Sequence, residues 1–547
     1  MNLIDEPWLP FRLRSGAIEY GPPCELARED VVDVAPPRAD FHGAAWQFLI
    51  GLLQTTCPPV DLEEWQAWWA DAPTAEQLQE HFARVRHAFN AFGDAPLFMQ
   101  ELDPMEDART ASVASLLIEA PGDQGLKFNT DHFIKRGFGE VMCPECSAMA
   151  LFTMQINAPS GGKGYRTGLR GGGPLTTLVL PDDPQAPLWQ KLWLNVLNAD
   201  DLGGGQPDFT DGSVFPWLAP TRVSEEAGTE ITPEEVHPLH VYWAMPRRFR
   251  LLKEEMDCTC QVCGAEVTEA VREVRTKNYG HNYGGAWIHP LTPYYRQDPK
   301  KPDEPPLSTK GQQGGLGYRH WEALVLEDTR NHQNLPARVV LDYQEKVEAL
   351  RDFGSVSHHA RLWVFGYDMD NMKARGWYAT YMPLLVIPKE QGLRDRFLEW
   401  VDTMVQAASD AAWLVRSTVK SAWYSRPKDA SGDFSFIDQR FWESTEAAFY
   451  GNLHQLSERL PDQSGAFMPE DVARRWHHNI RRTAMDLFDE LSLAGDAEAL
   501  DMKRIVAARN ELGKKLWGNK TMKALRAWAG MEDGTKKSKG KAAEEEA

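Results

Sequence analysis

The stretch GLRDRFLEWVDTMVQAASDAAWLVRSTVKSAW, residues 392–423, decides the fold of the C-terminal part of the chain. Its apolar residues recur at spacings of three and four, which is the period of one face of an α-helix. Three later segments repeat the pattern, and the breaks between them hold the Gly, Pro, Asp and Ser residues typical of helix ends: 438–460, 471–492 and 496–518. We therefore predict a C-terminal four-helix bundle over residues 389–530.

Residues 1–388 have a different composition and pattern: they are rich in Gly, Pro and Trp, and their apolar residues form short runs rather than long periodic segments. Residues 42–55, HGAAWQFLIGLLQT, predict a helix, and three runs are typical of strands: PLTTLVL at 174–180, ARVVLDY at 337–343 and RLWVFGYDM at 361–369. The fold class predicted is α+β, with a large irregular mixed domain followed by the bundle. Residues 531–547, with their blocks of like charge, are predicted to be disordered.

Length and composition place the chain among cytoplasmic globular proteins. Its 547 residues predict two or three domains, and their net charge of -20 argues against a generic nucleic-acid coat. The opening MNLIDEPWLP lacks the pattern of a secretory signal, and no uncharged apolar run of membrane-spanning length occurs. We therefore expect no membrane partner. Two basic islands interrupt the acidic background: 127–175, with six basic and three acidic residues, and 270–301, with six basic and two acidic.

Two C-x-x-C pairs, CPEC and CQVC, predict one structural zinc site with four thiolate ligands: Cys143, Cys146, Cys260 and Cys263. More than a hundred residues separate the pairs, so the metal would join distant parts of the chain. Cys258 makes the second pair C-x-C-x-x-C, and it could replace Cys260 as a ligand. A redox pair and incidental burial are the alternatives to zinc.

The first basic island contains a glycine-rich loop, SGGKGYRTGLRGGG, at 160–173. It matches neither the P-loop nor the dinucleotide-binding motif. Glycine lets a backbone approach a ligand closely, and Lys163, Arg166 and Arg170 would offer donors to phosphates or base edges. The loop is therefore either an anion-binding or nucleic-acid-binding element or simply a flexible turn.

The second basic island interleaves basic, amide and aromatic residues over 272–295, REVRTKNYGHNYGGAWIHPLTPYY. That mixture is typical of a nucleic-acid surface, although a strand and turn packing aromatic rings into a core would give the same pattern. No metalloprotease, hydrolase, metal-nuclease or helicase motif occurs, so the sequence shows no catalytic group.

Five segments, in this order, resemble the CasA family, the large subunits of the type I-E CRISPR surveillance complex Cascade. They are MNLIDEPWLP at 1–10, FNTDHFIKRGFGEVMCPECSAMALF at 128–152, GKGYRTGLRGGGPLTTLV at 162–179, GAWIHPLTP at 285–293 and FGYDMDNMKARGW at 365–377. The resemblance implies a non-catalytic subunit at the crRNA 5′-handle end, beside the backbone, handle-binding and small subunits. Such a subunit reads the protospacer-adjacent motif of duplex DNA from the minor groove, starts strand separation for R-loop formation and recruits a helicase-nuclease.

The resemblance also implies roles for particular residues. Motif readout falls on the glycine loop and on a lysine finger, here Lys277, with Arg275 or Asn278 as alternatives; the loop residues are Ser160, Gly161, Gly162, Lys163 and Gly164. The strand-separating wedge, usually Gln in the family, falls on Asp370 and Asn371. The loop from Lys127 to Gly139 would contact the crRNA handle through Phe128, Asn129, Lys135 and Arg136.

Two other classes of protein stay open from the sequence. One is a zinc-stabilised scaffold that binds only proteins, which would show no motif-dependent DNA binding. The other is a zinc-containing enzyme with unrecognised catalytic residues, which would show turnover. Minor-groove readout is largely A·T against G·C, so a motif reader of this kind should tolerate several motif sequences.

Overall fold

The computed structural model divides the chain into two compact units. It describes residues 1–120, 127, 137–159, 161–301, 303–311, 315–327, 333–350, 359–370, 373–387, 390–462, 465–494, 498 and 500–531. Unit 1 comprises Met1–Gly315 and Ala323–Leu384, and unit 2 comprises Leu316–Glu322 and Leu385–Ala547. Among the described residues, no helix combines the length and apolar composition that a membrane crossing requires.

Unit 1 is built around the buried helix α1, Ala39–Thr56, which confirms the helix predicted at 42–55. Nearly every residue of α1 is buried, so the helix forms a core rather than an amphipathic surface. Phe48 of α1 makes edge-to-face contacts with Phe98, Phe152 and Trp243, each with ring centroids less than 6 Å apart. Among the described residues, the other α-helices of this part of the chain are α2 (Leu62–Ala70), α3 (Ala75–Ala83), α5 (Pro144–Asn157), α6 (Leu188–Trp193), α7 (Ala199–Leu202), α8 (Trp321–Val325, whose first two residues belong to unit 2) and α9 (Arg338–Ala349).

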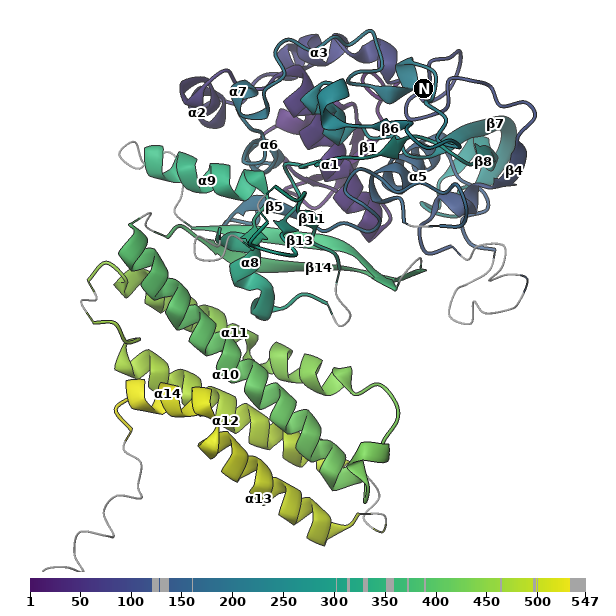
Figure 1. The fold of residues 1–547 in the computed structure, drawn as a ribbon. Helices are drawn as coiled ribbons and strands as arrows, with labels where there is room; N and C mark the ends of the chain where they lie inside the picture. The colour runs from purple at the N-terminus through teal and green to yellow at the C-terminus, as the bar shows by residue number, and fades with distance from the viewer. Residues whose placement is uncertain are drawn as a thin grey trace, which may run out of the picture. The chain divides into compact units, whose positions relative to one another are not determined.

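The strands form small separate sheets rather than one large sheet (Figure 1). The three-stranded sheets, in spatial order, are β2 (Ile18–Gly21), β1 (Leu9–Leu13) and β3 (Val31–Val34); β4 (Arg109–Ser112), β8 (Glu266–Lys277) and β7 (Arg248–Thr259); β14 (Lys373–Leu385), β13 (His359–Asp370) and β5 (Thr176–Pro181); and β11 (Leu307–Ser308), β10 (Tyr294–Tyr295) and β12 (Asn334–Leu335). A parallel pair joins β6 (Glu230–Ile231) to β9 (Asn282–Tyr283). The predicted α+β class is confirmed.

Two of the three predicted strands are confirmed, and one is wrong. PLTTLVL and RLWVFGYDM become β5 and β13, which pair antiparallel with Phe365 opposite Thr176. ARVVLDY, predicted as a strand, instead starts helix α9. Its β-branched residues favoured a strand locally, but the segment continues with apolar residues at helical spacing, and Val340, Tyr343 and Val347 are all buried.

A buried ion pair lies on α9. The ammonium group of Lys346 is 2.7 Å from the carboxylate of Asp342, and each side chain is only 4% exposed. Lys346 also donates to the carbonyl oxygen of Val196 at 3.1 Å and lies over the ring of Trp65. Burial of two charges is tolerated here because each has a partner.

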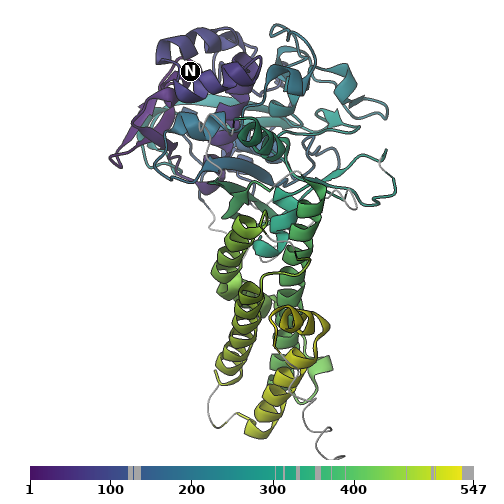
Figure 2. The same cartoon turned by 90° about the vertical axis from the view of Figure 1, so that its left-hand side faces the viewer.

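Unit 2 is a helical bundle that contains all four predicted helices and a fifth. They are α10 (Gln391–Trp423), α11 (Ser435–Arg459), α12 (Glu470–Ser492) and α13 (Met502–Gly518), followed by α14 (Lys520–Trp528). Helix α10 packs against α11, α12 and α13, and the long helices run beside one another in both views (Figures 1 and 2). Residues 316–322 join this unit, where Tyr318 stacks on Phe449 and shares a 2.8 Å hydrogen bond with Thr445.

We predict that Asp342→Ala destabilises unit 1 by about 3–5 kcal/mol, because it leaves the Lys346 ammonium group buried without its counter-ion. Differential scanning calorimetry of the variant and the wild type would measure the loss. The double variant Asp342→Leu/Lys346→Met, which removes both charges, should recover most of the stability. Equal destabilisation by the single and double variants would mean that the unpaired Lys346 charge is not what destabilises Asp342→Ala.

Candidate metal centre and nucleic-acid surface

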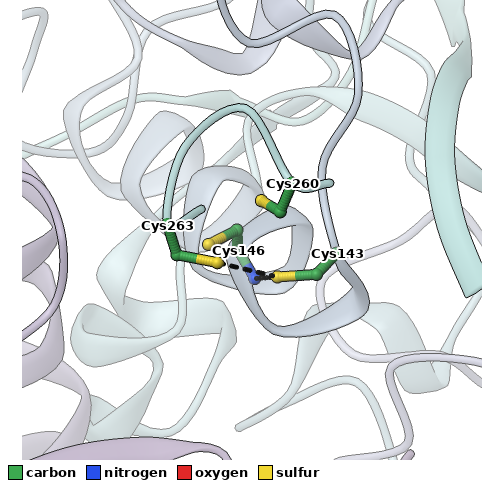
Figure 3. A group of neighbouring side chains, drawn as sticks. All are labelled: Cys143, Cys146, Cys260 and Cys263. Atoms are coloured by element: carbon green, nitrogen blue, oxygen red, sulfur yellow. Dashed lines mark hydrogen bonds between the residues drawn. The ribbon is translucent and has the colours of Figure 1, made fainter. Parts of the chain in front are cut away.

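Four cysteine sulfur atoms converge on one point in unit 1. The ligand atoms of Cys143, Cys146, Cys260 and Cys263 all lie within 4.8 Å of one another. Figure 3 shows the first pair at the start of α5 and the second pair in the turn that faces it. The sulfur atoms of Cys143 and Cys263 are 3.8 Å apart, which is about the edge of a tetrahedron with Zn–S bonds of ~2.3 Å.

The backbone brings the two cysteine pairs together. Cys143 caps α5 by accepting a hydrogen bond from the amide of Cys146, while Cys260 starts the turn that joins β7 to β8. The amide of Gln261 donates to the carbonyl of Val141 at 2.9 Å, and Met142 and Val271 exchange two backbone hydrogen bonds. The start of α5 and the β7–β8 hairpin are therefore joined by backbone as well as by the thiols.

The donor set suits a soft divalent cation such as zinc. Ionising one thiol disfavours ionising the next, and contact with Cys143 is the largest factor raising the pKa of Cys146. A bound cation would reverse this effect and favour the thiolates. Cys258 lies on β7 opposite Val267 and outside the cluster, so the geometry favours Cys260 over Cys258 as the ligand.

The glycine loop begins three residues after α5 and turns tightly. The amide of Tyr165 donates to the carbonyl of Gly162 at 3.0 Å. Gly162 and Lys163 are exposed, and a Cβ atom added at Gly162 would meet open space. Gly164 has a φ of +80°, and a Cβ there would come within 2.8 Å of Asn278. The loop thus presents bare backbone to solvent while its base is fixed against the hairpin.

Two hydrogen bonds join the glycine loop to the end of β8. The amide of Tyr279 donates to the carbonyl of Gly164 at 2.8 Å, and the side-chain amide of Asn278 donates to the carbonyl of Lys163 at 2.9 Å. The two groups predicted to read the motif, more than a hundred residues apart in sequence, therefore form one surface. An open groove of about 660 Å³ adjoins it, lined by Arg109, Tyr165, Val223, Glu225, Arg248, Thr276, Lys277, Asn278 and Tyr279.

The predicted lysine finger has a carboxylate partner. The ammonium group of Lys277 lies 2.6 Å from the carboxylate of Asp107, with the two side chains 27% and 80% exposed. This contact is the largest cause of the lowered pKa of Asp107. Because the pair is exposed and worth little, a nearby phosphate or base edge can compete with Asp107 for the lysine.

Two of the three basic residues of the glycine-rich segment do not face a ligand as predicted. Arg170 is 4% exposed, and burial lowers its pKa to about 10. Its guanidinium group donates to Gln47, Thr176, Thr292 and the carbonyl of Ile156, so it is a core residue. Arg166 donates to the side chain of Ser224 at 2.7 Å. Lys163 is the remaining exposed cation of the segment.

Part of the second basic island packs into the core, and part of it lies at the surface beside the glycine loop. His281 and Trp287 are buried, 4% and 5% exposed, and Tyr283 packs edge-to-face on Trp287. These rings belong to the core, whereas the segment from Lys277 to Tyr279 faces the glycine loop. The aromatic residues predicted as a nucleic-acid surface are thus mostly core residues.

Several predicted site residues lie outside the described part of the chain: Ser160, Phe128, Asn129, Lys135, Arg136 and Asn371. Asp370 is the last residue of β13. The wedge and the crRNA-handle loop therefore stay predictions. Arg247, which no sequence motif singles out, also supports the glycine loop: its guanidinium group lies 4.7 Å from the ring centre of Tyr165 and donates to the carbonyl of Arg166. The adjacent pair Arg247–Arg248, at the point where β7 begins, was the local sequence signal for it.

The chain matches the family model for CRISPR-associated protein Cse1 over residues 2–487. The chain belongs to the Cse1 family. Its fold is similar to that of CasA from Thermus thermophilus, at 17% identity and a TM-score of 0.65, covering 95% of this chain and 99% of that one. Cse1 from Thermobifida fusca gives 17% identity and a TM-score of 0.67, with 96% and 98% covered. A chain of a CRISPR RNA-guided surveillance complex gives 16% identity and a TM-score of 0.63, with 94% and 99% covered.

We predict that Cys143→Ser lowers bound zinc from about one atom per Cse1 chain to near zero and reduces solubility, because structural zinc binding is coupled to folding. Elemental analysis of protein purified without chelator measures the zinc. Cys258→Ser is the matched control and should keep the metal. Zinc-free wild-type protein would contradict the prediction, as would zinc loss in Cys258→Ser alone.

Proposed function

We propose that this chain is the large, non-catalytic subunit of a type I-E surveillance complex, Cascade, and that it reads the protospacer-adjacent motif in duplex DNA. Membership of the Cse1 family and the fold shared with a chain of an RNA-guided surveillance complex support the proposal. The observation that carries the DNA-reading part is the joint surface of the glycine loop and the end of β8. There an exposed backbone, Lys163 and Lys277 lie together.

The loop suits a narrow groove because it has no side chain where it would enter. The minor groove is about 6 Å wide, so a bare backbone at Gly162 can approach base edges that a side chain would keep away. Backbone amides and the exposed Lys163 supply donors to the acceptor atoms of that groove. The proposed contact with DNA is confined to this loop and the end of β8. This agrees with the net negative charge of the chain, which disfavours general binding along DNA.

Lys277 would exchange Asp107 for the DNA. Its ammonium group belongs to the last residue of β8, beside the loop, and Asp107 is its partner until a stronger acceptor arrives. Arg248, opposite Lys277 in the hairpin, is committed to the buried carboxylate of Glu101 at 2.6 Å. Lys277 is therefore the better candidate for base contact at this edge.

The remaining parts of the proposal rest on the family resemblance. After the motif is bound, the tip at Asp370 and Asn371 would insert beside the first base pair, and guide pairing would then extend the R-loop. The loop around Phe128, Asn129, Lys135 and Arg136 would anchor the subunit to the crRNA handle. The subunit would neighbour the backbone, handle-binding and small subunits in the cytoplasm and recruit the helicase-nuclease, while the metal, zinc, has a structural role.

We predict that Gly162→Asp weakens binding of the assembled complex to a motif-bearing duplex by about tenfold or more, because it adds bulk and a like charge at the groove. Gly392→Asp is the control, since a Cβ there also meets open space and the charge change is the same. Electrophoretic mobility shifts at matched salt measure both. Equal affinity of the two variants would mean that the loop is only a turn and does not contact the DNA. If the wild-type complex bound duplexes with and without the motif equally well, the protein-only scaffold would be favoured.

We predict that Lys277→Ala costs about 1–3 kcal/mol of binding on the preferred motif and less on motifs already mismatched at the base it contacts. Lys253→Ala is the matched control on the same hairpin, because Lys253 pairs with Glu269 at the same 2.6 Å and is 28% exposed. Titrations of the assembled complex against a set of motif variants measure both losses. A uniform loss across all motifs with a smaller salt dependence would assign Lys277 to phosphate instead.

A further inference from the structure

The two ends of the glycine-rich segment meet. Helix α5 ends at Asn157, and the amide of Gly173, at the far end of the segment, donates to the carbonyl of Asn157 at 3.2 Å. Compact loops whose ends lie close together are a common way to present a functional tip. We call Asn157 and Gly173 the loop base, because they are the residues from which the exposed tip at Gly162 extends.

The strand that follows the loop base belongs to the same sheet as the strand that leads to the proposed wedge. Strand β5 begins at Thr176 and pairs antiparallel with β13, with Phe365 opposite Thr176. Strand β13 then continues past this pair to Asp370, where the proposed wedge begins. The glycine loop and the wedge therefore extend from neighbouring strands at the same end of their ladder.

The loop base also touches the last part of β13 directly. Gly173 has a φ of +62°, and a Cβ atom added there would overlap the Cγ atom of Met369, the residue before Asp370. One turn of the pleat earlier, a Cβ atom added at Gly366 would lie 2.9 Å from the carbonyl oxygen of Pro174. The two segments thus leave no room for a side chain at Gly173, and Met369 is the residue of β13 that fills this contact.

A third segment, residues 308–311, holds the loop and β13 together. The side chains of Ser308 and Lys310 both donate to the carbonyl of Arg170, Lys310 at 2.8 Å. A Cβ atom added at Gly311 would overlap the carbonyl oxygen of Tyr367 on β13. The same short segment is therefore bonded to the glycine-rich segment and packed against the backbone of the wedge strand.

Strand β13 is in turn fixed to the core helix of unit 1. The hydroxyl of Tyr367, 2% exposed, donates to the carboxylate of Asp40 at 2.5 Å. Asp40 is in the first turn of α1, and its other partner is Arg38 at 2.9 Å. Because a buried charge is stable only with such partners, this part of β13 has a defined position.

We propose that Met369 is a positioning residue, which through its contact with Gly173 holds the strand-separating tip at a fixed offset from the bound motif. This inference rests on the proposed function and adds to it a link between motif readout and strand opening. With the contact intact, a loop seated in the minor groove places the end of β13 beside the first base pair to be opened. Functional groups generally need such support to stay within about 0.5 Å of their productive positions.

The first test is Gly173→Ala in the assembled complex, because the added methyl group would push Met369 away. Opening of an intact motif-bearing duplex, followed by the permanganate reactivity of thymines beside the motif, should slow about tenfold or more. Affinity for the same target with a mismatched bubble beside the motif should stay within about twofold of the wild type, since that target needs no opening. Gly205→Ala is the matched control: Gly205 has a φ of +71°, and a Cβ atom there meets open space.

The second test adds Met369→Ala to Gly173→Ala. The substitution removes the Cγ and Sδ atoms of Met369, and its Cβ atom would lie 3.6 Å from the new methyl group, an ordinary contact. The double variant should therefore open the duplex faster than Gly173→Ala, because residues in direct contact affect one another's substitutions. Met369→Ala alone, which loosens the contact, should open it more slowly than the wild type.

Three results would overturn the inference. They are equal opening rates for Gly173→Ala and Gly205→Ala, no recovery in the double variant, and equal impairment of Gly173→Ala on the intact duplex and on the bubble. The last result would mean that the contact supports only the fold or motif binding. A wild-type complex that binds the motif-bearing duplex without opening it would contradict the proposed function itself, and the inference with it.

Discussion

The proposed function depends on one constraint: the four cysteines and the backbone hydrogen bonds beside them hold the start of α5 against the tip of the β7–β8 hairpin. The four cysteines lie at one end of both elements. At the other end, α5 leads into the glycine loop and β8 ends at Lys277. Because a helix and a twisted hairpin are stiff, fixing one end orients the other, and the hydrogen bonds from Asn278 and Tyr279 complete the alignment. Under the proposed function, a structural metal held by the four cysteines would thus help to set the geometry of the DNA-reading surface from a distance.

The positive charges of the molecule lie at a few particular places and do not give it a general attraction for nucleic acid. At the proposed motif-reading surface, Lys277 is paired with Asp107 and Arg248 with Glu101. On α12 of unit 2, by contrast, Arg481 and Arg482 are exposed and line a groove that has no acidic residue among its described lining residues. Under the proposed function, a degenerate minor-groove contact would be enough, because sequence discrimination would come from base pairing with the guide.

Features with a regular period or a fixed spacing could be predicted from the sequence. The helices of unit 2 and the convergence of two C-x-x-C pairs are of this kind. The strand predicted at 337–343 failed because burial of Val340 and of the Asp342–Lys346 pair overrides the local preference of β-branched residues. Arg170 looked like a ligand-facing cation, yet its acceptors come from sequence positions as distant as Gln47 and Thr292, and no local signal shows them.

The central claim is that the glycine loop and the end of β8 read the motif as one surface. A double-mutant cycle with Gly162→Ala and Lys277→Ala tests it most directly, with affinity for the motif-bearing duplex measured in the assembled complex at one salt concentration. If both positions contact the same base pairs, the two losses should differ from additivity by more than about 0.5 kcal/mol. Losses that add within about 0.3 kcal/mol would contradict the claim, because they would show two independent contacts.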